Sequence, residues 1–173
     1  MASDDVQPRT DTGGSLPSGR FGGRLAFEAL VLNAFQQAAI EGWSDMTLSD
    51  ANFLDWPLNQ RAVIESLSNW AVAGRRLTIL ANRYDALQRH HPRFVTWRRT
   101  WDHLVEARAC DEPVRGDVPS AIWSPSWCLR RIDPVHHTGF CGADRAMNVN
   151  LKETLTERLR TSAPGFPASV LGL

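Results

Sequence analysis

The 173-residue sequence lacks the features that mark membrane, secreted and disulfide-stabilised proteins. Its longest uncharged stretches have 12 or 13 residues, whereas a bilayer-spanning helix needs about 20 apolar residues. The N-terminus carries Asp4 and Asp5 and has no apolar central region, so it does not resemble a secretory signal. Three cysteines are too few for a disulfide scaffold, and we expect Cys110, Cys128 and Cys141 to stay reduced. These absences predict a cytoplasmic protein that does not enter the membrane.

The sequence also lacks the common catalytic and cofactor motifs. It has no Gly-x-Ser-x-Gly elbow, no dinucleotide-binding glycine fingerprint and no zinc-protease helix. Residues 14–19 have the glycine spacing of a phosphate loop, but Arg20 and Phe21 replace the required lysine and hydroxyl residue. The cysteines, His136 and His137 show no paired spacing of the kind that structural zinc sites use. We therefore expect neither a metal nor another cofactor.

The composition that remains is that of one globular domain. Hydrophobic residues make up 43% of the chain and charged residues 22%, and a chain of this length buries roughly 70% of its unfolded surface. Residues 1–22 are rich in Gly, Ser, Asp and Pro and lack an apolar period, which predicts a disordered N-terminal tail. We expect a single α/β domain over residues 23–163 and a C-terminal tail over residues 164–173.

Acidic and basic residues are equal in number but unevenly distributed along the chain. Residues 1–74 hold nine acidic and four basic side chains, a net charge of −5. Residues 75–108 hold eight arginines against three acidic side chains, a net charge of +5, and the rest of the chain is balanced. Of the 19 basic residues, 18 are arginine and one is Lys152. The basic middle segment is therefore a candidate contact for an anionic partner.

Apolar periodicity predicts alternating helices and strands. Helical spacing over residues 25–42, with Gly42 as a C-cap, is followed by a short strand over residues 46–49. A helix over residues 58–73 and a compact strand over residues 77–81 come next, and this order predicts two parallel neighbours in one sheet. We then expect a helix from Pro92 that carries Phe94, Trp97 and Trp101, followed by a strand over residues 104–110. Residues 121–127 and 128–132 are expected to form a hairpin at the edge of the sheet, and a final helix should lie between residues 144 and 163. The predicted fold class is α/β, with a single layer of mixed β-sheet covered by helices.

Three runs carry this order of elements: Asp45–Asp50 (DMTLSD), the helix end Trp70–Arg75 (WAVAGR) and Leu77–Ala81 (LTILA). Together they resemble one half-domain of the phospholipase D-like superfamily. The stretch Leu129–Asp133 (LRRID), with Gly139, Phe140, Asp144 and Arg145 after it, is similar to the end of small bacterial domains of this superfamily that lack its catalytic signature. The resemblance covers residues 24–163 and implies a phospholipase D-like half-domain.

Catalytic members of that superfamily carry His-x-Lys followed by four residues and Asp. Their histidine attacks phosphorus, and their lysine binds the phosphate oxygens. The nearest match here is His137, Thr138 and Gly139 with Asp144, so glycine occupies the place of the lysine. Without this cation, the charge that develops on a phosphoryl group loses a principal stabiliser. The resemblance therefore implies the fold without phosphodiesterase chemistry, and we interpret the spacing of His137 and Asp144 as coincidental.

Two arguments select candidate ligand-binding residues. Arginines alternate with aromatic side chains over residues 75–99, a combination typical of surfaces that hold phosphates and stack on bases. The alternative is that Trp97 and Trp101 lie in the core while the arginines form the solvent-exposed face of a helix. Ligands of open α/β sheets lie beyond the carboxyl ends of strands, which here selects the residues that follow the two parallel strands. The candidate ligand-binding residues are Asp50, Arg83, Tyr84, Arg89, Arg98 and Arg99.

We therefore expect a noncatalytic phospholipase D-like domain that binds a protein partner or a phosphate-bearing ligand. Four of the seven tryptophans, Trp43, Trp56, Trp123 and Trp127, fall near expected loops or edges and favour a protein contact or self-association if they are exposed together. Two alternatives remain open. One is nucleic-acid binding through residues 75–99, and the other is a phosphodiesterase-type enzyme with a degenerate active site.

Overall fold

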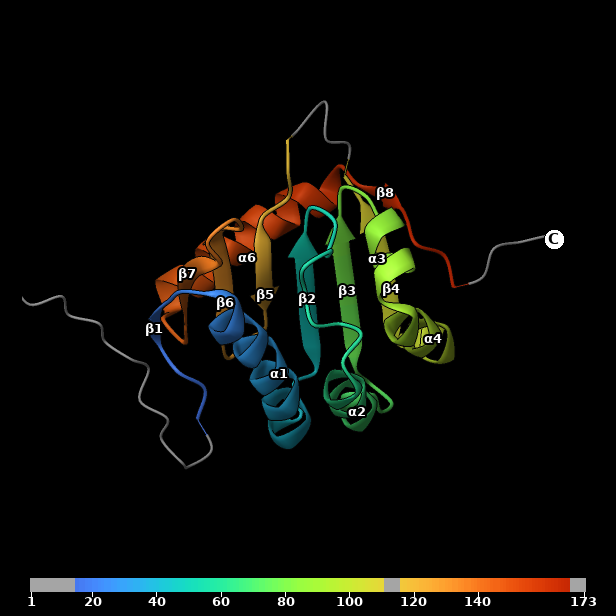
Figure 1. Ribbon diagram of the computed structural model, residues 1–173, viewed down its shortest axis with the longest axis horizontal. Helices are drawn as coiled ribbons and strands as arrows, with labels where there is room; N and C mark the ends of the chain where they lie inside the picture. Colours follow the sequence, from blue (N-terminus) through green and yellow to red (C-terminus); the bar gives the residue numbers. More distant parts are fainter. Residues whose placement is uncertain (1–14, 111–115, 169–173) are drawn as a thin grey trace, which may run out of the picture.

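The computed structural model describes residues 15–110 and 116–168, which form one eight-stranded mixed sheet and five α-helices (Figure 1). The strands lie in the order β1-β7-β6-β5-β2-β3-β4-β8. Their bounds are β1 Gly19–Phe21, β2 Asp45–Asp50, β3 Arg76–Ala81, β4 Val105–Ala109, β5 Ser120–Trp123, β6 Cys128–Asp133, β7 Thr138–Gly142 and β8 Ala163–Pro164. The predicted α/β fold class, a mixed sheet covered by helices, is confirmed.

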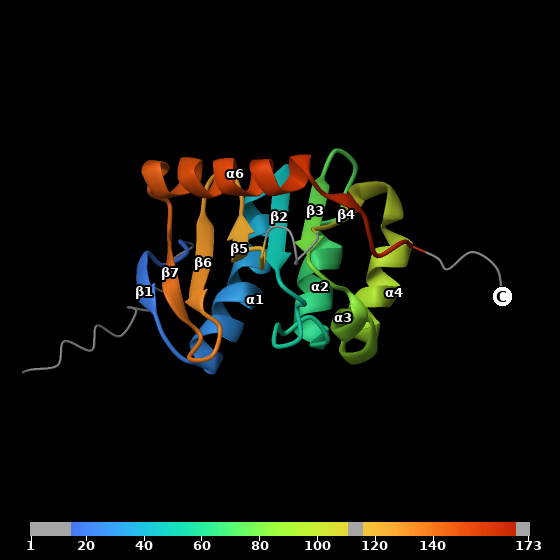
Figure 2. The same cartoon turned by 90° about the horizontal axis from the view of Figure 1, so that it is seen from above.

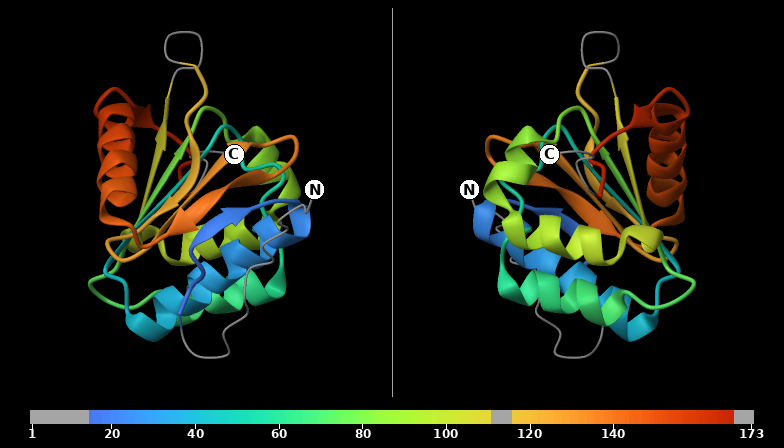
Figure 3. Two further views of the ribbon diagram at one scale, coloured as in Figure 1. Left: turned by 90° about the vertical axis from the view of Figure 1, so that its left-hand side faces the viewer. Right: turned by 90° about the vertical axis from the view of Figure 1, so that its right-hand side faces the viewer.

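Helices cover both faces of this sheet (Figures 2 and 3). Helices α1, α2, α3 and α4 lie on one face, and the long helix α6 crosses the other face. Their bounds are α1 Arg24–Glu41, α2 Arg61–Trp70, α3 Asp85–His90, α4 Pro92–Thr100 and α6 Arg145–Arg160. Within the described ranges, none of these helices is both long and apolar enough to cross a membrane.

Strand alternation divides the apolar side chains between the two faces. Met46 and Leu48 of β2 belong to the core beneath α1, α2 and α4, whereas Leu80 of β3 packs with Leu151 and Leu155 of α6. Six of the seven tryptophans are buried, with exposures of 1–6%. The tryptophans that the sequence places near loops and edges, Trp43, Trp56, Trp123 and Trp127, therefore form no exposed aromatic surface.

The predicted parallel pair is present. Strands β2 and β3 lie side by side with Leu48 opposite Ile79 and Asp50 opposite Ala81, and α2 connects them. Strand β4 extends the parallel part, with Ala107 opposite Ile79. All three strands therefore end at the same edge of the sheet, which places the loops after Asp50 and Ala81 next to each other.

Two helix termini match their sequence signals. Gly42 ends α1 in the left-handed conformation with φ 69°, which glycine adopts without the strain of a Cβ atom. At the other end of the chain, the Asp144 carboxylate accepts a hydrogen bond of 2.9 Å from the Met147 backbone N–H and caps α6. The first and the final predicted helices thus occur where the sequence indicates.

The predicted hairpin forms, but it lies inside the sheet rather than at its edge. Strand β5 pairs with β2, with Ile122 opposite Leu48, while β6 pairs with β7 on its other side. The edge is occupied instead by β1, which pairs with β7 through Arg20 opposite Phe140. Pro125 is tolerated because it lies in the turn between β5 and β6, outside the hydrogen-bonded ladder.

Both expected tails contribute to the fold in their described parts. Strand β1 lies within residues 1–22, and β8 pairs with β4 at the C-terminal side. Phe166, which is 4% exposed, stacks on Tyr84 with ring centroids 5.2 Å apart. Such short segments carry too few residues to show an apolar period, and the six-residue helix α3 was missed for the same reason.

Candidate functional site

A pocket of about 520 Å³ opens beyond the carboxyl end of β2, where open α/β sheets commonly hold ligands. The loop after β2, the beginning of β5 and the β6–β7 hairpin surround it. Asp50, which was selected from the sequence because it follows the expected strand, lines the pocket together with Asn52. The charged residues of its lining are Asp50, Asp55, Asp117, Arg130 and Arg131.

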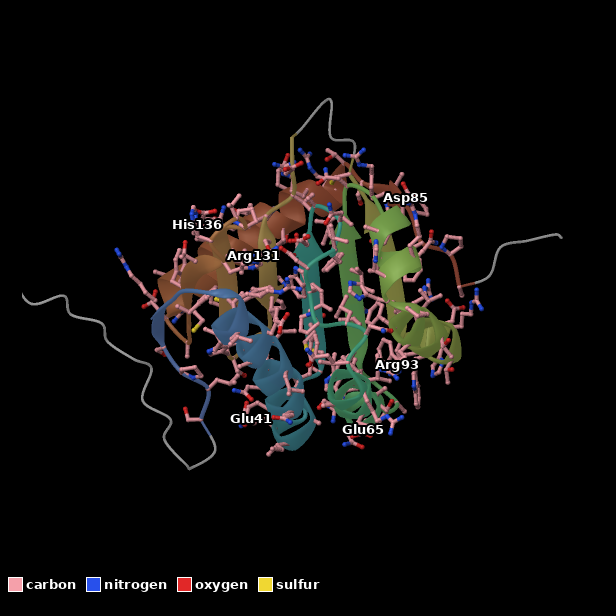
Figure 4. The ribbon with its side chains drawn as sticks, in the orientation of Figure 1. Glu41, Glu65, Asp85, Arg93, Arg131 and His136 are labelled. Atoms are coloured by element: carbon pink, nitrogen blue, oxygen red, sulfur yellow. The ribbon has the colours of Figure 1, made fainter. Side chains whose placement is uncertain are left out.

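Arg131 of β6 forms the floor of this pocket, and each of the five N–H donors of its guanidinium has an acceptor. Nε donates to Ser120 Oγ over 3.0 Å. Nη1 donates to Asp55 Oδ2 over 2.9 Å and to His137 Nδ1 over 3.0 Å. Nη2 donates to Asp50 Oδ1 and Asp55 Oδ1, each over 3.0 Å. The side chain is 1% exposed, and Figure 4 shows it over the sheet near β5 and β6.

The five residues Arg131, Asp50, Asp55, Ser120 and His137 are named here the Arg131 cluster. The second oxygen of Asp50 accepts the backbone N–H groups of Asn52 and Phe53, so the same carboxylate shapes the loop beside the pocket. The Phe27 ring covers the guanidinium carbon of Arg131 at 4.3 Å. Because His137 accepts through Nδ1, a neutral His137 carries its proton on Nε2.

Because all N–H donors of Arg131 have acceptors, the floor of the pocket is poorly suited to bind an anion. Arg131 has no N–H donor left for an incoming anion, and the two carboxylates outnumber the guanidinium by one charge. A phosphate in the pocket would also face Asp117 at the rim. The Arg131 cluster therefore joins β6, β2, β5 and two loops, and it disfavours the phosphate-bearing ligand that the sequence led us to expect at Asp50.

Sequence reasoning did not select Arg131, although one signal was present. In a strand, residues two apart share a face, so Arg131 lies on the same face as Leu129, which is fully buried. A charged side chain on a core-facing position needs partners. These partners, Asp55 and Asp50, lie 76 and 81 residues earlier in the chain, where no local pattern identifies them.

Tyr84 and Arg98 meet each other through Phe166 rather than through a ligand. The Tyr84 hydroxyl donates to the Arg108 carbonyl over 2.7 Å, and burial raises the pKa of this hydroxyl far above its usual value. Arg98 donates from Nε to the Phe166 carbonyl over 3.1 Å and from Nη1 to Asp102 over 2.6 Å. Both candidate residues thus hold the C-terminal segment against the domain.

The remaining candidates, Arg83, Arg89 and Arg99, are exposed; Arg89 lies in α3, Arg99 lies in α4 and Arg83 lies just before α3. Arg93 lies on the same side of the molecule as Asp85, as Figure 4 shows, and its Nη1 donates to the Asn59 carbonyl over 2.9 Å. We name the exposed set the α3–α4 basic surface: Arg83, Arg89, His90, Arg93 and Arg99. Arg75 and Arg76 lie at the opposite end of β3, so residues 75–99 do not form one continuous patch.

The residues that approach the phospholipase D signature have separate structural roles. His137 belongs to the Arg131 cluster, whereas Asp144 caps α6. Between them, Gly139 is pressed against β6. A Cβ atom at this position would overlap the Arg130 carbonyl oxygen and would lie 2.8 Å from Arg131 Cα. The position that holds lysine in catalytic members therefore has no room for a side chain.

The cysteines and histidines form no metal centre in the part of the chain that the structure describes. All three cysteines are buried thiols that form no disulfide. Burial raises the pKa of Cys128 and of Cys141 to about 11, so both remain protonated thiols at neutral pH. Protonated thiols are poor nucleophiles and poor metal ligands.

Buried His91 adjoins the loop of the pocket and makes the stability of the fold sensitive to acid. Its Nε2 lies 2.8 Å from the Phe53 carbonyl oxygen, and its Nδ1 is buried without a partner. Burial lowers the pKa of His91 despite the opposing effects of the Phe53 carbonyl and Asp55. The unfolded chain, whose histidines titrate near pH 6.5, therefore binds a proton that the folded protein takes up only at lower pH.

We expect the free energy of unfolding to fall as the pH decreases from about 6.5, the ordinary pKa of histidine, towards the lower pKa of folded His91. Urea titrations at pH values between 5 and 7 measure this dependence. His91→Gln keeps a donor for the Phe53 carbonyl and should flatten the curve, whereas His103→Gln, at an exposed position that does not act on His91, should leave it unchanged. An equal acid dependence of the wild type and His91→Gln would contradict the assignment.

Comparison with known proteins shows a likeness in structure but none in sequence. No protein-family model matches the sequence, and no curated protein matches it. The structure of TrmBL2, an archaeal chromatin protein described with a novel mode of DNA binding, superimposes with a TM-score of 0.63 at 13% sequence identity. The match covers 90% of this chain and 56% of TrmBL2, so this chain spans little more than half of that protein. At this identity, the likeness shows that the two proteins share a fold.

Proposed function

We propose that this chain is a noncatalytic, phospholipase D-like binding module that contacts nucleic acid through the α3–α4 basic surface. One observation carries the proposal. Between residues 83 and 100, four arginines are exposed, namely Arg83, Arg89, Arg93 and Arg99, whereas Asp85 is the one exposed acid. The fifth arginine of this range, Arg98, is buried and forms an ion pair with Asp102 at 2.6 Å. The exposed side chains of this range carry a net formal charge of +3 when His90 is neutral.

The chemistry of this surface favours the phosphate backbone over the bases. A guanidinium can bind two phosphate oxygens at once, whereas base stacking needs exposed rings. Tyr84 and Trp97 are 8% and 3% exposed, so neither ring is available for a base. We therefore propose binding to the sugar–phosphate backbone of duplex DNA with little sequence preference.

Two further considerations support this choice of partner. TrmBL2, which shares the fold, is described as a chromatin protein that binds DNA. The neutral net charge of the whole chain does not oppose a local contact, because salt screens exposed charges beyond about 8 Å at physiological ionic strength. Distant acidic groups therefore weaken a local contact between these arginines and a phosphate backbone only slightly.

The phospholipase D-like part of the proposal has its own support. The parallel pair β2 and β3 with the intervening helix α2 has the order that the resemblance implies. Two observations support the absence of catalytic activity. Gly139 stands in the place of the lysine, and His137 Nδ1 accepts a hydrogen bond from Arg131. A binding role requires neither of these groups to react.

Fluorescence anisotropy with a labelled DNA duplex at low salt tests the proposed function. We expect the double variant Arg89→Glu/Arg99→Glu to bind at least about tenfold more weakly, because it removes two phosphate contacts. The slope of the logarithm of affinity against the logarithm of salt concentration should become shallower by about two. Arg20→Glu/Arg145→Glu, an exposed pair with the same change of charge, is the control. Absence of binding by the wild type, or an equal loss in the control, would refute the proposal.

A further inference from the structure

A second hollow lies beside α6, on the face of the sheet that this helix crosses. Parallel strands are normally covered on both faces. Here α6 runs behind the sheet towards the carboxyl ends of β3 and β4, where Leu80 and Cys110 pack with Leu155 (Figure 1). The amino-terminal halves of β2, β3 and β4 carry polar side chains on this face and surround a hollow of about 360 Å³. Its charged lining consists of Asp45, Arg76, Glu106, Arg108 and Lys152.

Strand register explains how these groups come together. Thr47 of β2, Thr78 of β3 and Glu106 of β4 lie directly opposite one another. Asp45 lies opposite Arg76 one step earlier on the same face. Thr47 and Thr78 are each 7% exposed, so they form the floor, and the charged side chains form the walls. The arrangement therefore places two hydroxyls at the bottom of a charged hollow.

Two cations of the hollow, Lys152 and Arg108, are held in place but keep donors for a ligand. The ammonium of Lys152 lies 3.8 Å from the centre of the Trp123 ring, which fixes the one lysine of the chain above the sheet. Arg108 uses Nε and Nη2 for the hydroxyl and carbonyl of Ser162, and three of its five N–H donors are not used by these bonds. This contrasts with Arg131, whose donors are saturated.

The charged groups around the hollow are not paired with one another. None of the ion pairs between described residues involves Asp45, Arg76, Glu106 or Lys152. Three cations against two carboxylates leave a net charge of +1. The carboxylates would repel an anion that has no hydrogen-bond donors. A ligand with both an anionic group and hydroxyl groups can bind the cations through the former and the carboxylates through the latter.

We propose that this hollow binds a small phosphorylated molecule with free hydroxyl groups. Lys152, Arg76 and Arg108 hold the phosphate, while Asp45 and Glu106 accept hydrogen bonds from the hydroxyls of the ligand. Thr47 and Thr78 contribute hydroxyls at the floor. Helix α6, which contributes Lys152 and Leu159 to the hollow, crosses the face of the sheet opposite α3 and α4, so the inference does not depend on nucleic-acid binding.

Ribose 5-phosphate is a suitable probe, with inorganic phosphate and ribose as its two halves. Reductive methylation with ¹³C-formaldehyde labels Lys152 as the single lysine, so one side-chain NMR resonance besides that of the N-terminus reports on the site. We expect ribose 5-phosphate to shift this resonance saturably, inorganic phosphate to bind more weakly, and ribose alone to cause no shift. Calorimetry with unmodified protein then gives the affinities.

Matched variants distinguish a specific binding site from an ordinary charged surface that does not bind the ligand. Lys152→Met and Arg76→Met should each weaken binding of ribose 5-phosphate by about tenfold or more, because each removes a charge-assisted hydrogen bond. Arg145→Met removes an exposed charge from the same helix as Lys152 and should leave the affinity unchanged. The proposal fails if the wild type shows no saturable shift, if Lys152→Met binds as the wild type does, or if Arg145→Met loses as much. Equal affinities for inorganic phosphate and ribose 5-phosphate would overturn the role of the hydroxyls.

Discussion

Replacing Arg131 by methionine should lower the free energy of unfolding by about 3–5 kcal/mol, because it leaves buried carboxylate charge without a partner. Asp50 is 4% exposed, and both of its oxygens face groups inside the protein. Asp55 would lose both of its guanidinium bonds in the same step. The variant also removes the donor to Ser120, so β5, β6 and the loop after β2 lose their common contact. Equilibrium unfolding in urea, followed by circular dichroism, measures this change.

Arg130→Met is the matched control for this prediction. Arg130 is the preceding residue on β6, and it is half-buried without a described ion pair. Its replacement should cost less than about 1 kcal/mol, the usual scale for a surface position. The double variant Asp55→Asn/Arg131→Met should be more stable than Arg131→Met alone, because one unpaired charge is gone. If Arg130→Met and Arg131→Met proved equally stable, the Arg131 cluster would have no special role in holding the fold together.

Local patterns in the sequence were sufficient for the elements that bury a periodic face. The long helices α1 and α6 and the strands β2 and β3 were predicted because caps and apolar spacing lie within a few residues of each other. The position of the β5–β6 hairpin was wrong because strand order is decided by partners far away in the chain. Strand β1 covers β7 at the edge, and it consists of three residues within an apparently featureless tail.

The candidate site shows the same division between local and distant information. Asp50 was selected from its place after a strand, and it does line the pocket there. Its partner Arg131 is 81 residues away, and a sequence pattern does not encode which carboxylate meets which guanidinium. Tyr84 and Arg98 were selected for their chemistry, yet both are committed to Phe166, from a segment that was expected to be a tail. Residue type therefore indicated what each side chain can bind, while its tertiary partner decides whether it is available.

Eight of the 18 arginines of the chain fall into three groups according to their surroundings. Arg131 and Arg98 are buried and paired, and they serve the fold. Arg83, Arg89, Arg93 and Arg99 are exposed and form the proposed nucleic-acid surface. Arg76 and Arg108 line a hollow together with the one lysine. The net charge of the 75–108 segment therefore arises from groups with different roles at different faces, and a sequence total cannot distinguish them.

Gly139→Ala should be the most damaging single-methyl substitution in the sheet. The added Cβ would overlap the Arg130 carbonyl oxygen and would lie 2.8 Å from Arg131 Cα and 2.9 Å from Phe21 Cζ. Two of these contacts are backbone atoms of β6, which cannot move without breaking the ladder between β6 and β7. We expect a loss of about 3 kcal/mol or more in the free energy of unfolding, at the upper end for overpacked sites. Gly22→Ala, whose Cβ would meet Thr138 Cγ2 at an ordinary 3.6 Å, is the control and should cost less than about 1 kcal/mol.

The same contact determines whether phosphodiesterase chemistry can be restored at this site. Gly139→Lys supplies the residue that the His-x-Lys signature requires, but the lysine needs a Cβ atom where the Arg130 carbonyl already lies. We therefore expect Gly139→Lys to unfold or to lose β7, and to show no hydrolysis of bis(p-nitrophenyl) phosphate. A folded Gly139→Lys variant with measurable hydrolysis that His137→Ala abolishes would contradict this expectation. Such a result would mean that the close approach of β6 and β7 does not require glycine at position 139. The chain would then be a phosphodiesterase-type enzyme that lacks only the lysine of its signature.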